Sequence, residues 1–158
     1  MDELVVLEKN GEALQEYCSL IVESGVRRIA SFPPDSIAIG YSVTGVHFLK
    51  LDRSKKQLSK RNRERDSRTV FACSMLSADD IIATTAFGTV YTLSCHDSQP
   101  QSGMEVGTLE SQAIFAANEA ALRILPCGMT YNFQKQTKNE IVVLITIMGS
   151  IIGMMTVQ

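Results

Sequence analysis

The chain has 158 residues, of which 45% are hydrophobic and 20% are charged, and its formal net charge is −2. This length and composition predict one folded domain with a sizeable core and argue against an intrinsically disordered chain. The small net charge gives, by itself, no indication of a polyanionic partner.

The first part of the chain predicts short strands. Residues 4–7 are a short apolar run, and residues 8–11 predict a hairpin turn with Asn10-Gly11 at its tip. Residues 13–20 fit a returning strand, but the spacing of their apolar residues also fits one or two turns of helix. Residues 26–32 are the next predicted strand.

The middle of the chain predicts antiparallel strands separated by turns. Pro33-Pro34-Asp35-Ser36 predicts a turn by its composition, and Asp79-Asp80 and Phe87-Gly88 mark two more. Short β-branched runs divided by such turns are typical of an antiparallel meander. The predicted strands of this part are residues 37–40, 46–51, 70–75, 81–85 and 90–93.

The meander repeats along the chain. In each unit a polar turn precedes an apolar strand, and a glycine (Gly45, Gly88 or Gly149) precedes the next apolar strand. The first two units lie about 44 residues apart, close to the blade repeat of a β-propeller. The sequence therefore predicts an all-β fold of antiparallel meander blades, about three blades of an incomplete propeller, in one segment over residues 1–158. The predicted blade-like units are residues 20–58, 68–97 and 119–158, with a polar insertion at residues 97–118.

The apolar run at residues 141–157 allows two interpretations. It carries no charge and is about as long as a short transmembrane helix. Its richness in Ile, Val and Thr favours two buried strands with a turn at Gly149-Ser150. A membrane-associated protein anchored by this run is the alternative.

Cysteine and histidine spacing predicts neither a metal site nor a cofactor. The four cysteines (Cys18, Cys73, Cys95 and Cys127) form no Cys-x-x-Cys pair. Cys73 and Cys95 lie in apolar strands, which favours reduced, buried thiols, with a disulfide as the alternative.

Three constellations resemble catalytic motifs, and none meets the requirements of its chemistry. Residues 40–45 lack the second glycine of a nucleophile elbow. Asp79 and Asp80 are adjacent, so their side chains diverge, and they are better explained as turn residues. Cys95 and His96 are also adjacent and face opposite sides of a strand. We therefore expect no enzyme, no catalytic residue and no small-molecule substrate.

The main charge feature is the basic run at residues 53–68, with eight basic and two acidic residues. One interpretation is a nucleic-acid-binding patch. The other is a solvated outer strand and loop, because the alternation at residues 60–65 leaves no apolar face and suits an exposed edge protected by charge. The candidate nucleic-acid-binding residues are Lys55, Lys56, Lys60, Arg61, Arg63, Arg65 and Arg68.

Three segments carry a resemblance to a known family. They are residues 45–51 with residues 54–58; residues 70–94, above all Ala72-Cys73-Ser74-Met75-Leu76 with Asp79-Asp80 and Phe87-Gly88; and residues 105–125 with Thr146, Gly149, Ile152 and Gly153. Residues 20–157 thereby resemble the C-terminal propeller region of the cleavage and polyadenylation specificity factor A-subunit family. That family includes the large damaged-DNA-binding subunit and the large propeller subunit of the branch-site splicing complex.

The sequence departs from the family pattern in three places. Thr108-Leu109-Glu110-Ser111 stands where a His-Val/Leu-Gly-Glu-like run is usual, the final glycine pair is spaced one residue wider, and the family's helical C-terminal part is absent after Gln158. The resemblance implies a scaffold without catalysis, in a nuclear multi-subunit complex with protein partners, and with cytoplasmic placement as the alternative. It also implies contact with DNA or RNA in some members, directly or through a partner.

Overall fold

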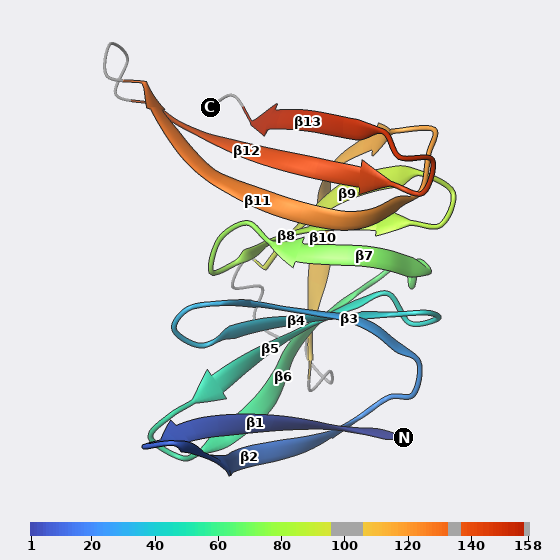
Figure 1. Cartoon of the computed structure of the whole chain (residues 1–158). Helices are drawn as coiled ribbons and strands as arrows, with labels where there is room; N and C mark the ends of the chain where they lie inside the picture. Colours follow the sequence, from blue (N-terminus) through green and yellow to red (C-terminus); the bar gives the residue numbers. More distant parts are fainter. Residues whose placement is uncertain (96–105, 133–136, 157–158) are drawn as a thin grey trace.

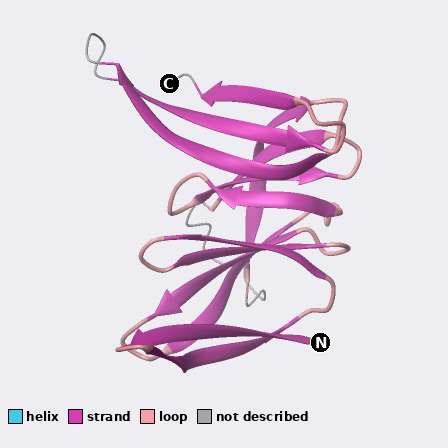
Figure 2. Cartoon of the chain, in the orientation of Figure 1, coloured by secondary structure: helices cyan, strands magenta, loops and turns pink. Residues whose placement is uncertain are grey.

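The computed structural model describes residues 1–95, 106–132 and 137–156, and this part of the chain contains strands but no helix (Figures 1 and 2). Short β-branched runs bounded by Gly, Asp and Ser turns account for this content. The strands are β1 (Asp2–Asn10), β2 (Ala13–Val22), β3 (Val26–Phe32), β4 (Ser36–Tyr41), β5 (Val46–Asp52), β6 (Gln57–Glu64), β7 (Val70–Met75), β8 (Asp80–Thr85), β9 (Thr89–Ser94), β10 (Gly107–Ala116), β11 (Ala121–Asn132), β12 (Thr137–Thr146) and β13 (Ile151–Thr156).

The strands form a hairpin and three meanders stacked one above another (Figure 1). The hairpin is β1–β2, the first blade is β3–β6, the second blade is β7–β10, and the third blade is β11–β13. Neighbouring strands within each meander are antiparallel. The first strands of successive blades lie beside one another, because β7 contacts both β3 and β11. This arrangement is that of an incomplete β-propeller, as the sequence predicted.

Three hydrophobic clusters fill the spaces between the sheets. The hairpin packs on the first blade through a cluster that includes Val22, Tyr41 and Leu58. A second cluster, with Phe48 and Leu93, lies between the first and second blades. The third cluster joins the second and third blades. Each blade buries its faces only against a neighbour, which is the physical basis of stacked repeats.

One strand belongs to two blades. The first three residues of β10, Gly107–Leu109, pair in parallel with the end of β6. The remainder of β10 then pairs antiparallel with β9. β10 therefore joins the first and second blades into one continuous eight-stranded sheet. It also lies within residues 97–118. The sequence predicted a polar insertion there, because most side chains of β10 face solvent and give no alternating apolar signal.

The structure decides between the alternatives for two other segments. Residues 13–20 belong to strand β2, not to a helix, because they pair along their length with β1. The loop of that hairpin is Gly11-Glu12. Within residues 141–156 the chain forms the end of β12 and all of β13, paired antiparallel. No helix in the described ranges is long and apolar enough to cross a membrane.

An incomplete propeller leaves a sheet face uncovered at each end of the stack. We therefore expect the chain expressed alone to self-associate through these faces. Val142 is 2% exposed in the cluster under the third blade, whereas Val143 lies on the outer face of the same strand. Val143→Lys should shift the chain towards monomer in size-exclusion chromatography with light scattering. Val142→Lys should instead lower the free energy of unfolding by more than about 3 kcal/mol, because it buries an unpaired charge. A wild-type chain that stays monomeric at all concentrations contradicts this prediction.

Candidate nucleic-acid interface

Strand β6, which carries much of the basic run, lies inside the sheet and not at its edge. It is paired with β5 on one side, and its last three residues, Asn62–Glu64, are paired with β10 on the other. The prediction of an exposed edge is therefore wrong for residues 62–64. Asn62 and Glu64 are buried, while Arg61 and Arg63 are exposed. Residues 60–65 have no apolar face. The buried positions among them instead hold the polar side chains of Asn62 and Glu64, which face the neighbouring blade.

The basic side chains of β6 point to both faces of the sheet. Lys60 lies opposite Leu49 and Arg63 lies opposite His47, so both occupy the face towards the hairpin. A register shift separates Lys60 from the next paired residue of β6. Arg61 lines a groove on the other face. Lys60 and Arg63 also help lower the pKa of His47, behind the larger effect of its burial.

Two further candidates lie in the turn between β5 and β6. The Lys55 ammonium is 3.7 Å from Asp52, and the Lys56 ammonium is 5.3 Å from the centre of the Tyr17 ring. The Tyr17 hydroxyl donates a hydrogen bond to the carbonyl of Arg53 (2.8 Å). This turn is therefore a docking point for the hairpin. Both lysines stay exposed, so each can still reach a phosphate.

Arg68 has structural partners that the sequence did not reveal. Its guanidinium donates hydrogen bonds to Glu64 (2.8 Å), Asp66 (2.5 Å) and Ser111 (2.9 Å). Its centre also lies 4.7 Å from the centre of the Tyr91 ring. The side chain is only 21% exposed. The structure therefore places Arg68 between the first two blades, apart from the exposed arginines of β6.

The carboxylate that Arg68 meets is the most buried acidic group of the basic run. Glu64 accepts a hydrogen bond from the Val46 N–H (3.0 Å) and one from the Tyr91 hydroxyl (3.2 Å). Burial raises the pKa of Glu64, and these hydrogen bonds and Arg68 oppose that rise. Gly45 has a φ of +78°, and a Cβ there would lie 2.6 Å from the carboxylate. We call Glu64, Arg68 and Tyr91 the interblade cluster.

Sequence reasoning missed the interblade cluster, although one signal was present. Glu64 is a lone acid at an alternating position within a basic strand, and Gly45 marks the turn that packs on it. Ser111, which accepts a hydrogen bond from Arg68, lies in the segment that departs from the family pattern. Tyr91 and Ser111 are distant from Glu64 and Arg68 in the sequence, so only the stacking of blades brings these residues together.

A groove of about 510 Å³ opens between the turns of the first two blades, beside Arg61. Two of its cations are paired with carboxylates of the groove, while Arg61 stays exposed. Arg53 binds Asp35 (2.8 Å), and the Lys50 ammonium is 3.9 Å from Asp79. The groove therefore offers a polar surface that contains two ion pairs. Its lining residues are Asp35, Phe48, Lys50, Leu51, Asp52, Arg53, Ser59, Arg61, Asn62, Asp79 and Cys95.

The residues that resembled catalytic motifs take part in turns and packing. Asp80 accepts hydrogen bonds from Ser77 (2.8 Å) and Ser94 (2.7 Å), which fixes the turn before β8. The Cys95 thiol donates to Asn62 (2.8 Å), while His96 lies outside the described residues. Among the described residues, Cys18 and Cys73 are free thiols, and Cys73 is buried. Among the described residues, no group of three potential ligands could hold a metal ion.

The sequence matches the CPSF A subunit region over residues 2–158. The chain belongs to this family. No curated protein matches it. The family match confirms the family predicted from the sequence, and the stacked blades confirm the predicted fold. Members of the CPSF A family are generally non-catalytic β-propeller scaffold subunits of multi-protein complexes.

The interblade cluster predicts a large effect of one substitution. Glu64→Ala leaves the Val46 N–H, the Tyr91 hydroxyl and the Arg68 guanidinium without this acceptor. It should lower the free energy of unfolding by about 2–4 kcal/mol. The neighbouring control Arg65→Ala, at an exposed side chain, should change it by less than about 0.5 kcal/mol. Urea denaturation at one fixed protein concentration measures the free energy of unfolding of both variants. Equal decreases in the two variants would contradict the prediction.

Proposed function

We propose that this chain is a non-catalytic β-propeller scaffold segment that binds protein partners in a nuclear multi-subunit complex. The candidate complexes are of the DNA-damage ubiquitin ligase, pre-mRNA 3′-processing and splicing types. The observation that carries the proposal is the CPSF A match over residues 2–158 on a stack of propeller blades. Stacked blades present long rigid faces and turns, which suit a scaffold better than a deep catalytic cleft.

The scaffold proposal is tested in cells. The chain carries an affinity tag at its own locus, and a nuclear extract is fractionated by size. We expect the tagged chain to elute with defined subunits in constant ratio, and mass spectrometry of those subunits assigns the type of complex. Elution of the bulk of the chain as free protein in the cytosolic fraction contradicts the proposal. Glu64→Ala provides a control for loss of partners through misfolding.

We further propose that the solvent-accessible cations of the basic run bind nucleic acid by its phosphates. Lys55, Lys56, Lys60, Arg61, Arg63 and Arg65 line β6 and its two ends, a span of about 23 Å between the ends of the strand. Arg68 contributes its charge through the interblade cluster and is not expected to contact a phosphate. Aromatic residues do not interleave the run, so recognition should be independent of sequence.

The nucleic-acid proposal predicts a charge-dependent affinity. Lys60, Arg61 and Arg63 changed together to Glu should abolish retardation of a labelled oligonucleotide at low salt, because three phosphate contacts become repulsive. A matched variant with Lys9, Arg27 and Arg123 changed to Glu carries the same net charge and should bind as the wild type does. Wild-type affinity should fall steeply with salt. Equal losses in the two variants would show that only net charge matters, and that β6 is not the interface.

A further inference from the structure

Three turns at the same position in successive blades face the same side of the molecule, on the right in Figure 1. Each joins the second strand of its blade to the third: β4 to β5, β8 to β9, and β12 to β13. Backbone hydrogen bonds tie the second and third of these turns to the linker between their blades, from Ala117 to Gly88 (2.8 Å) and from Ile147 to Ala120 (2.9 Å). We call the tips of the three turns the turn rim.

Each turn of the rim carries a large apolar side chain that is exposed. Val43 is 70% exposed, Phe87 is 89% exposed and Met148 is 75% exposed. Ile147 and Ile151 add apolar surface beside Met148. Turn tips are usually Gly, Asn, Asp or Ser, which suit both the backbone and water. Apolar side chains gathered at the same place in three blades indicate a surface that a partner covers.

The rim is held in place before any partner binds. The Thr85 hydroxyl accepts hydrogen bonds from the N–H groups of Phe87 (3.3 Å) and of Thr89 (3.2 Å). In the third blade, Glu119 accepts a hydrogen bond from the Thr146 hydroxyl and another from the Ser150 hydroxyl (3.2 Å). Ordered turns lose little conformational entropy on binding, so their apolar contacts contribute more fully to affinity.

Three acidic side chains beside the rim are engaged within the chain. They are Glu64, Asp66 and Glu119. Glu64 and Asp66 bind Arg68, and Glu119 fixes the turn of the third blade. Glu23 is half-buried; its charge adds to the rise that burial causes in the pKa of Tyr41 and opposes the lowering that burial causes in the pKa of His47. The rim therefore presents little free negative charge to a partner.

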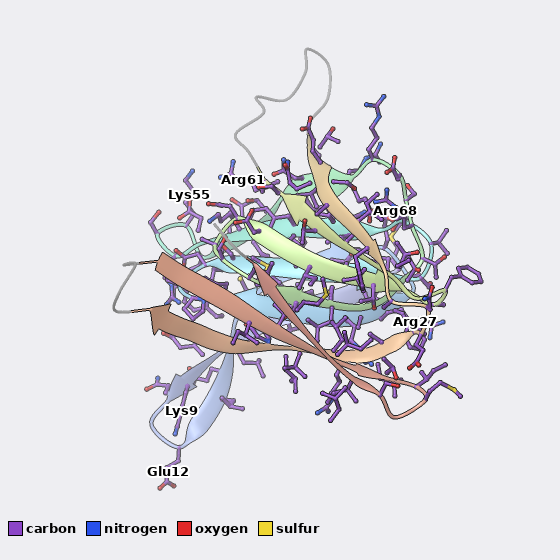
Figure 3. The ribbon with its side chains drawn as sticks, turned by 90° about the horizontal axis from the view of Figure 1, so that it is seen from above. Lys9, Glu12, Arg27, Lys55, Arg61 and Arg68 are labelled. Atoms are coloured by element: carbon purple, nitrogen blue, oxygen red, sulfur yellow. The ribbon has the colours of Figure 1, made fainter. Side chains whose placement is uncertain are left out.

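Two cations remain available at the first-blade end of the rim. Arg27 follows the first residue of β3, and Arg65 follows the last residue of β6. Both are exposed, and neither guanidinium has a hydrogen bond or ion pair within the described part of the chain. Figure 3 labels Arg27 on the same side as Arg68, opposite to the hairpin tip at Lys9 and Glu12. The first-blade end of the rim thus combines two cations with Val43, whereas the second and third blades present Phe87 and Met148.

We propose that the turn rim binds a segment of a partner protein that combines acidic residues with large apolar side chains. The carboxylates meet Arg27 and Arg65, and the apolar side chains cover Phe87 and Met148. This inference rests on the proposed scaffold function, for which it names a surface and the chemistry of a partner. Nucleic acid could also pair with the two arginines, but it would leave most of the apolar surface uncovered.

The probe is a display library of short random peptides, selected on the whole wild-type chain. Enriched peptides should carry at least two large apolar residues together with Asp or Glu. Their affinity, measured by fluorescence anisotropy, should fall about tenfold or more for a variant with Val43, Phe87 and Met148 changed to Ser. A second variant, Arg27→Glu with Arg65→Glu, should lower the affinity for the acidic peptides by a similar factor. The matched control, Leu7, Leu14 and Ile21 changed to Ser on the exposed hairpin, should bind as the wild type does.

The outcomes separate this inference from the proposed function. Thermal melts that match the wild type show that each variant is folded. If selection yields no peptide, or only peptides that bind the wild type and the rim variant equally, the inference is overturned. If an oligonucleotide, and not a peptide, depends on Phe87 and Met148, the rim is a nucleic-acid site and the inference is again wrong. The nuclear fractionation above decides the scaffold function separately, because a chain can assemble through another face.

Discussion

The parallel contact between β6 and the start of β10 is the constraint on which the rest of the structure depends. A meander blade has two faces, and neither can be buried by the blade itself. The first residues of β10 leave the second blade and pair with β6, which fixes the first blade against the second. Leu109, the last residue of that parallel pairing, is 1% exposed within the cluster between these blades. Backbone pairing and apolar packing therefore act at the same seam.

The electrostatics of this seam explain why a strongly basic strand can lie inside a sheet. Glu64 is 2% exposed, and a buried carboxylate is stable only when its hydrogen bonds and charge are satisfied. Arg68 and Tyr91 come from beyond the strand and satisfy it from the neighbouring blade's side. The remaining cations of β6 stay accessible to solvent. The ion pair between Arg68 and Glu64 thus has a structural role, whereas the other cations of the basic run remain available to a partner.

A scaffold function follows from this division of surfaces. The faces of the blades are used in stacking, so recognition falls to the turns and to exposed side chains of the outer strands. The two candidate surfaces differ in chemistry: the cations of β6 suit phosphates, whereas the turn rim with Phe87 and Met148 suits a protein. A single stack of blades can therefore present two surfaces of different chemistry.

The sequence by itself determined the all-β class, the three repeating units and the family. These are local properties, because β-branched runs and the glycines at Gly45, Gly88 and Gly149 specify strands and tight turns over a few residues. Tertiary structure alone decided the place of β10, the interior position of β6 and the role of Arg68. An outer strand with exposed side chains has no apolar period, and whether a cation meets solvent or a carboxylate depends on which blade stacks against it.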